Sequence, residues 1–180
     1  MNLKKLVTAA VCTMLMAAVA FTAGCGGEKK SDKKVLKVGM ECAYAPYNWS
    51  QTKADGGAVK IAGSNEYAYG YDVMMAKKLA DSMGADLEIH KIEWDGLAPA
   101  VVSGKIDAAI AGMSITSKRK ETVDFTKPYY YATVVALVKK DSEQAKAQSV
   151  ADLKGSVATS QLNTIWYDQI DQVPDVKKLP

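Results

Sequence analysis

The sequence predicts an α/β protein built on a mostly parallel, doubly wound sheet. Short apolar runs alternate with amphipathic stretches between residues 35 and 110, in the order strand, helix, strand, helix, strand. This order is typical of consecutive β-α-β units, because parallel strands need a crossover connection. The composition agrees, since 48% of the 180 residues are hydrophobic and 24% are charged, as in a globular chain with a core.

The chain begins with the pattern of an export signal. Lys4 and Lys5 precede an apolar run over residues 6–21, and small residues then lead to Cys25. This resembles a bacterial lipoprotein signal in which Cys25 carries the lipid, although Thr22 stands where that motif most often has Leu. Cleavage by the general signal peptidase and a single transmembrane anchor are the alternatives.

Further elements follow from periodicity and capping residues. Residues 35–40 alternate as a first strand, and residues 71–83 have apolar side chains at helical spacing, with Gly84 ending the helix and Met83 expected in the core. The polar connection between them holds at most a small hairpin. The elements expected next are a strand over 86–93, a helix over 95–102 with Asp95 as N-cap, and strands over 106–110 and 123–126.

The composition changes after residue 138. A β-branched run over 132–138 ends at two lysines, and the polar stretch 142–148 is interpreted as a crossing between lobes. A capped helix over 149–155, a strand over 156–159 and a helix over 164–170 should follow, and so short a second lobe is expected to be incomplete. The predicted organisation is a lipoprotein signal peptide 1–24, a flexible tether 25–34, a ligand-binding lobe 35–138, and a hinge crossing with part of a second lobe 139–180.

Charge and rare residues argue against several functions. The formal net charge of +3 includes two lysines of the signal, and no basic stripe with stacking aromatics is visible, so we expect no nucleic-acid partner. Cys42 should be a small buried hydrophobic residue. His90, the single histidine, is favoured as an ordinary strand residue over a general base. We expect no cofactor and no metal site.

Residues 112–119 form the candidate binding motif, where a strand runs into a helix with Thr116 or Ser117 as N-cap. The free N–H groups of a helix start suit an anion. Arg119 lies in the first turn and can make a two-pronged contact to a carboxylate, which contributes about 1.5–3 kcal/mol. The alternative is a surface arginine paired with an acidic residue shortly after it.

The order and spacing of several phrases resemble those of extracytoplasmic solute-binding proteins for amino acids, which serve ATP-driven importers. The resemblance covers residues 35–180 and implies a two-lobed, periplasmic-binding-protein-like fold, the second lobe only partly present. The phrases that carry it are VGMECAYAPY at 38–47, GYDV at 70–73, EWDGL at 93–97, GKIDA at 104–108, GMSIT at 112–116, Arg119, and DFTKPYY at 124–130.

The resemblance also implies where the ligand binds, in a cleft that closes like a hinge. The implied ligand-binding residues are Arg119 and the main-chain N–H of Ser114 for the α-carboxylate, the backbone of Gly112 for the α-amino group, Tyr44 and Trp94 over the side chain, Glu41 at its polar end, and the turn Asn163-Thr164 closing on the carboxylate. The family usually has Gly-Thr or Ser-Thr in this turn. Packing roles are the alternatives for Tyr44 and Trp94.

These residues lead us to expect a monomeric lipoprotein, anchored to the membrane outside the cytoplasm, that captures a polar or basic L-amino acid and delivers it to an ABC-transporter permease. No catalytic pair is visible, so we expect no enzyme activity. Two other classes remain open. One is an enzyme on the same scaffold, a dehydratase or cell-wall lyase module, with Glu41 as its candidate acid or base. The other is the ligand-sensing domain of a membrane receptor.

Overall fold

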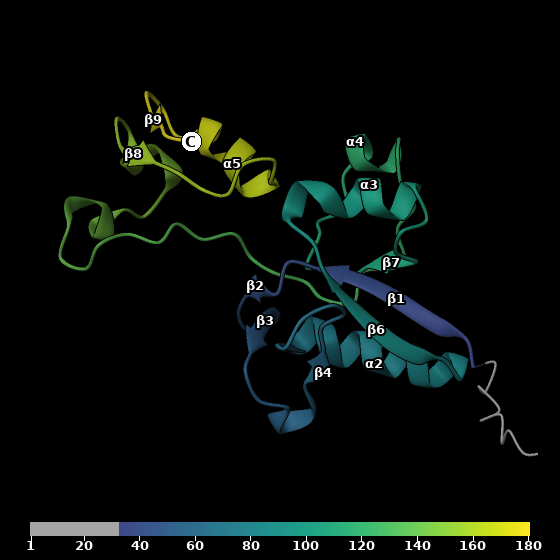
Figure 1. The fold of residues 1–180 in the computed structure, drawn as a ribbon. Coiled ribbons are helices and arrows are strands. Elements are labelled where there is room, and N and C mark those ends of the chain that lie inside the picture. The colour runs from purple at the N-terminus through teal and green to yellow at the C-terminus, as the bar shows by residue number, and fades with distance from the viewer. Residues whose placement is uncertain (1–32) are drawn as a thin grey trace, which may run out of the picture. The chain divides into compact units, whose positions relative to one another are not determined.

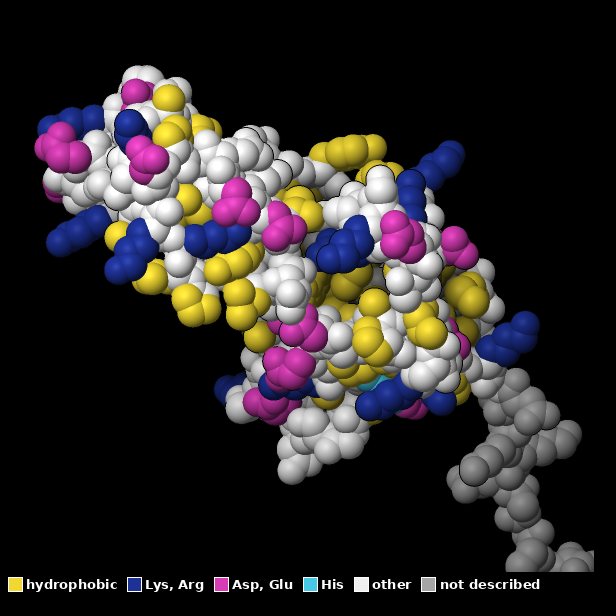
Figure 2. Space-filling model, turned by 90° about the horizontal axis from the view of Figure 1, so that it is seen from above, with side chains coloured by type: hydrophobic (Ala, Val, Ile, Leu, Met, Phe, Trp, Pro, Cys, Tyr) yellow, Lys and Arg dark blue, Asp and Glu magenta, His cyan; other side chains and the backbone are white. Residues whose placement is uncertain are grey.

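The computed structural model describes residues 33–180. The predicted signal peptide over 1–24, the predicted lipidation site Cys25 and most of the predicted tether lie outside the described residues. Within the described part, no helix is long and apolar enough to cross a membrane. On the face shown in Figure 2, acidic and basic side chains are interspersed.

The main sheet has three parallel strands in the order β6-β1-β7. β1 (Val35–Met40) pairs with β6 (Asp86–Lys91) along its whole length, whereas β7 (Ala108–Ala109) is shorter than the predicted strand over 106–110. Helices α2 (Tyr71–Met83) and α3 (Leu97–Val102) lie on opposite faces of this sheet (Figure 1). This arrangement confirms the predicted doubly wound, parallel sheet.

Helix α2 has the predicted bounds, and Gly84 ends it in the left-handed conformation with φ 61°. Its buried face consists of Asp72, Val73 and two alanines. The prediction that Met83 fills the core is wrong, because its side chain is 52% exposed. Helix α2 leads into β6, whose first residue, Asp86, pairs with the exposed Val35 of β1, and no residue of the described part buries Met83 there.

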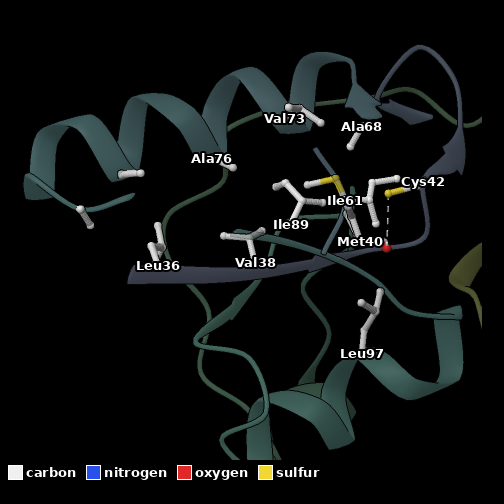
Figure 3. Packing of buried hydrophobic residues seen from close by; sticks show 13 residues of the cluster. Leu36, Val38, Met40, Cys42, Ile61, Ala68, Val73, Ala76, Ile89 and Leu97 are labelled. Atoms are coloured by element: carbon white, nitrogen blue, oxygen red, sulfur yellow. Dashed lines mark hydrogen bonds between the residues drawn. The ribbon is translucent and has the colours of Figure 1, made fainter. Parts of the chain in front are cut away.

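The core lies between α2 and the main sheet, and Leu97 from α3 packs on the other face (Figure 3). Val38, Met40 and Ile89 are fully buried. Burial of one such side chain contributes about 1.5–3 kcal/mol. The core therefore fixes β1, whose carboxyl end delivers Glu41 to the candidate site.

A second sheet replaces the expected polar connection. Its antiparallel strands run in the order β2 (Ala43–Tyr44), β3 (Asn48–Gln51), β5 (Tyr67–Tyr69) and β4 (Val59–Lys60), with the 3-10 turn η1 (Asp55–Gly57) before β4. Trp49 and Tyr69 face each other across β3 and β5 with ring centroids 5.1 Å apart. Aromatic cross-strand pairs of this kind stabilise a sheet, which is why the segment folds beyond a small hairpin.

Two local predictions are wrong. The helix after β6 starts with the 3-10 turn η2 (Trp94–Gly96), so Glu93 rather than Asp95 is its N-cap. Residues 123–126 form no strand, because no partner strand pairs with them in the described part of the chain. The apolar run over 132–138, for which no strand was predicted, also lies outside the strands, and Leu137 is 98% exposed.

The last part of the described chain contains short elements near the predicted positions. The capped helix is a 3-10 turn, η4 (Val150–Leu153), with Ser149 and Asp152 forming its capping box. The predicted strand and helix are confirmed as β8 (Val157–Ala158) and α5 (Ile165–Gln169). The remaining elements are η3 (Glu143–Lys146), η5 (Ile170–Gln172) and β9 (Lys177–Lys178), which pairs in parallel with β8.

Candidate functional site

Arg119 lies in the short helix α4 (Ser117–Lys120), whose N-cap is Thr116, one of the two residues predicted for that position. The Thr116 hydroxyl accepts a hydrogen bond from the Arg119 N–H at 3.1 Å. The guanidinium donates from Nη1 to the Ser114 carbonyl at 2.7 Å and from Nη2 to the Asn163 carbonyl at 3.1 Å. Within residues 33–180, no ion pair joins it to a carboxylate, so the alternative of a surface salt bridge does not describe this arginine.

The surroundings of this guanidinium favour an added anion. Partial burial lowers the pKa of Arg119, and the charge of Asp168 acts in the opposite direction. The guanidinium carbon lies 5.2 Å from the centre of the Trp94 ring, within cation–π range. A guanidinium has five N–H groups, and its two carbonyl contacts leave others for a further acceptor.

Glu41 follows β1 and supplies a carboxylate near the same place. Its Oε1 atom accepts a hydrogen bond from Gln161 Nε2 at 2.8 Å. Glu41 is partly buried, and the next residue, Cys42, is fully buried with φ 56°. This left-handed turn directs the chain from the main sheet into β2.

Two aromatic residues, Tyr44 and Trp94, line a cavity beside these groups. Tyr44 stacks on Tyr47 with ring centroids 5.0 Å apart and remains 41% exposed. Trp94 packs partly against the core, as its alternative role required, and its Nε1 also donates to the Asn163 carbonyl at 3.0 Å. Trp94 therefore combines a packing role with a place beside Arg119.

Gly112 brings backbone close to the Tyr44 ring. Its φ is 63°, a left-handed conformation that favours glycine, and a Cβ here would lie 3.5 Å from the ring. The Gly112 N–H donates to the Tyr129 hydroxyl at 3.0 Å. Ser114 lies two residues further on and contributes its carbonyl oxygen to Arg119.

The turn at Asn163 and Thr164 contacts Trp94, Asp95 and Arg119. Asn163 adopts φ 60°, and its Nδ2 donates to Asp95 Oδ1 at 3.0 Å. Its carbonyl accepts from both Trp94 and Arg119. Thr164 is buried and caps α5 by accepting the Tyr167 N–H at 3.2 Å.

Beside these contacts lies a cavity of about 400 Å³, a size suited to a small molecule. The predicted residues that line it are Glu41, Tyr44, Trp94, Gly112 and Thr164. Ser114 lines an adjoining cavity of about 300 Å³ instead. Arg119 and Asn163 line neither cavity, but both contact Trp94, which lines the larger one.

The larger cavity also has lining residues that the sequence did not indicate: Tyr47, Ala111, residues 132–135, Ser160, Gln161 and Trp166. Gln161 precedes the predicted turn by two positions, so proximity in sequence could have identified it. Residues 132–135 gave no such signal, because an apolar β-branched run is typical of a buried strand.

The Cys42 and His90 side chains lie outside both cavities. The Cys42 thiol is buried, and burial raises its pKa to about 11, which keeps it protonated and a poor nucleophile. His90 lies on β6, 2.7 Å from Glu88, and lines neither cavity. No cluster of residues in the described part could hold a metal ion.

Comparison with known proteins gives a consistent picture. A family model described as bacterial extracellular solute-binding proteins, family 3, matches residues 36–175. The arginine-binding extracellular protein ArtP of Bacillus subtilis (strain 168) is 33% identical over 140 residues, which cover 78% of this chain and 49% of ArtP. The octopine-binding periplasmic protein of Rhizobium meliloti is 33% identical over 138 residues, covering 77% of this chain and 41% of the relative.

A solved structure shows the same likeness. The ancestral amino acid-binding protein AncCDT-1, described as a precursor of cyclohexadienyl dehydratase, superimposes with a TM-score of 0.66 at 34% identity. The match covers 81% of this chain and 60% of that chain. The chain thus spans about half the length of the curated relatives it matches.

Proposed function

This chain belongs to the bacterial extracellular solute-binding proteins, family 3, and from that premise we propose that it binds an amino acid for an ABC importer. The predicted fold class, an α/β periplasmic-binding-protein-like fold, is confirmed by the family match and by the likeness to AncCDT-1. The amino acid itself, the transport partner and the site residues are parts of the proposal.

The observation that carries the proposal is the setting of Arg119. Its guanidinium is partly buried, lies over Trp94 and contacts two carbonyl oxygens, and no carboxylate of the described chain forms an ion pair with it. A carboxylate is a stronger acceptor for a guanidinium than a neutral carbonyl is. A ligand carboxylate would therefore accept hydrogen bonds from the Arg119 guanidinium in place of the Asn163 carbonyl, while the hydrogen bond from Arg119 to the Ser114 carbonyl would remain.

The residues that line the larger cavity favour a polar or basic L-amino acid. Tyr44 and Trp94 offer aromatic faces, which contribute about 0.5–2 kcal/mol to a cationic head group. The Glu41 carboxylate can accept a hydrogen bond from the polar end of the ligand. In the structure it accepts one from the Gln161 side-chain amide, and a cationic ligand group would replace that amide because charge-assisted hydrogen bonds are stronger. Two of the relatives, the arginine-binding protein ArtP and the octopine-binding protein, are named for basic ligands, which supports this class.

The cellular setting completes the proposal. We infer an export signal over 1–24, a lipid on Cys25, and a tether over 25–34 that holds a monomeric binding domain outside the cytoplasm. The ligand would pass from this domain to permease subunits in the membrane. The family description supports the extracellular setting.

The test is a thermal-shift screen of the full-length protein against the common L-amino acids, followed by calorimetry on the best ligand. Arg119→Ala should weaken binding by about 10- to 100-fold, because a charge-assisted contact contributes about 1.5–3 kcal/mol, with little change in ligand-free stability. Lys118→Ala, in the exposed neighbouring position, is the matched control. Wild-type affinity in Arg119→Ala, or no stabilisation by any amino acid, would contradict the proposal.

One observation keeps an enzyme in view as a second candidate. AncCDT-1 is a binding protein described as a precursor of a dehydratase. Glu41 is the carboxylate that lines the larger cavity here, and it could act as an acid or base. Conversion of the bound amino acid during incubation, lost in Glu41→Gln, would favour this candidate over simple capture.

A further inference from the structure

A chain of side-chain hydrogen bonds joins two backbone turns beside the larger cavity. The Cys42 N–H donates to Asn48 Oδ1 at 2.8 Å, and Asn48 Nδ2 donates to Asp72 Oδ2 at 2.7 Å. The Tyr129 hydroxyl donates to Asp72 Oδ1 at 2.7 Å and accepts the Gly112 N–H at 3.0 Å. We call the side chains of Asn48, Asp72 and Tyr129 the polar bridge.

Two of the three side chains of the bridge are fully buried, and the third, Tyr129, is half-buried. Asn48 and Asp72 are both 0% exposed. Burial raises the pKa of Asp72, while the hydrogen bonds from Tyr129 and Asn48 act in the opposite direction. Burying a carboxylate is costly unless its oxygens are satisfied, and each Asp72 oxygen receives a short hydrogen bond.

Stability alone does not account for such a bridge. Apolar side chains of similar volume commonly stabilise a core as well as a buried polar group does. What they cannot do is fix the direction of two backbone N–H groups. Tyr129 is also held at its own backbone, because the Tyr71 hydroxyl donates to the Tyr129 carbonyl at 3.1 Å.

Both ends of the bridge are left-handed turns at the edge of the cavity. Cys42, with φ 56°, follows the cavity residue Glu41, and Gly112, with φ 63°, lines the cavity itself. These turns follow β1 and β7, which are adjacent strands of the main sheet. The bridge therefore ties together the two strand ends that present the candidate ligand groups.

We propose that Asn48, Asp72 and Tyr129 are positioning residues that set amino-acid affinity by fixing the Cys42 and Gly112 turns. None of them needs to touch the ligand for this role. The inference rests on the proposed function for its ligand, but the conformation of the turns can be measured without one.

The order of donors and acceptors suggests a set of matched variants. Tyr129→Phe removes the hydroxyl that Gly112 uses. Asn48→Asp places a second carboxylate beside that of Asp72 and removes the hydrogen bond between residues 48 and 72. Adding Asp72→Asn reverses the pair, so that the amide of residue 72 donates to the carboxylate of residue 48 and both ends keep their acceptors. Tyr67→Phe, in β5, is the control for loss of a tyrosine hydroxyl away from the bridge.

The first measurement is amide hydrogen exchange in the ligand-free, full-length protein. Tyr129→Phe should speed hydrogen exchange at the Gly112 amide. Asn48→Asp should speed exchange at the amides of both Gly112 and Cys42. Exchange at the Val38 amide in the core should not change in either variant. The reversed double variant should return both rates toward wild type, and Tyr67→Phe should alter neither. Wild-type exchange at Gly112 in Tyr129→Phe would overturn the proposed role.

The second measurement is calorimetric binding of L-arginine. Tyr129→Phe and Asn48→Asp should each bind about tenfold more weakly than wild type, with the reversed double variant recovering most of the loss. Unchanged affinity in Tyr129→Phe, or failure of the double variant to recover affinity when exchange has recovered, would overturn the positioning role. If wild type does not bind L-arginine, the proposed basic ligand fails, and the exchange rates alone decide whether the bridge fixes the turns.

Discussion

The surroundings of Arg119 mark this single side chain as a candidate binding group. Partial burial of a guanidinium is unfavourable without acceptors, and neutral carbonyls satisfy it less well than a carboxylate does. Its placement was predictable because Thr116 is a strong N-cap and fixes where α4 starts. The hydrogen bond from Arg119 to the Asn163 carbonyl could not be predicted from local pattern, because the two residues are 44 positions apart.

Cys42 leads to a prediction about pH. Its thiol pKa is raised to about 11 by burial, so the folded chain keeps the proton between pH 9 and 11 while the unfolded chain loses it. The free energy of unfolding should therefore fall as the pH rises through this window. Denaturant titrations should show that wild type loses about 1–3 kcal/mol more than Cys42→Ala between pH 9 and 11.

The Cys42→Ala comparison isolates the thiol, because alanine retains a Cβ in the same left-handed turn and all other titrating groups are shared. Parallel pH dependence in the two proteins would show that the thiol ionises equally well in the folded and unfolded chains, contrary to its burial.

Among the elements, those with strong local periodicity were predictable. β1 alternates and α2 carries its own stop signal at Gly84, so both had the expected bounds. The antiparallel sheet could not be foreseen in full, because its register depends on contacts such as that between Trp49 and Tyr69. Residues 123–126 failed as a strand because β-propensity counts only where a partner strand is present.

Gly70 connects these elements and leads to a prediction about stability. It adopts φ 127° before α2, and a Cβ there would lie 2.3 Å from the Tyr47 carbonyl oxygen. That carbonyl also accepts the Asp72 N–H at 2.8 Å. Thermal or denaturant unfolding should show that Gly70→Ala destabilises the fold by about 3 kcal/mol, through backbone strain and displacement of the turn.

Gly63→Ala is the matched control, because Gly63 also has a positive φ but a Cβ there would meet no atom within 4 Å. The Gly63→Ala substitution should lower the free energy of unfolding by only about 1 kcal/mol. Equal destabilisation by the two substitutions would mean that the close approach at Gly70 does not matter.

For the molecule as a whole, the sequence located the strand ends at which ligand groups gather but not the side chains that hold them. Glu41 and Gly112 follow predicted strands, and open α/β sheets bind ligands at such ends. Asp72 and Tyr129 gave no sequence signal of a role at the site, because they reach it only through hydrogen bonds between segments far apart in the sequence. Polar side chains buried within apolar patterns are the feature that could have drawn attention to Asp72.

The central claim is that the site recognises the carboxylate of an amino acid through Arg119. The most direct measurement is calorimetry of the full-length protein with L-arginine and with agmatine, which has the same side chain but lacks the carboxylate. L-Arginine should bind at least about 100-fold more tightly than agmatine, and Arg119→Ala should remove most of that preference. Equal affinities for the two compounds would contradict the claim.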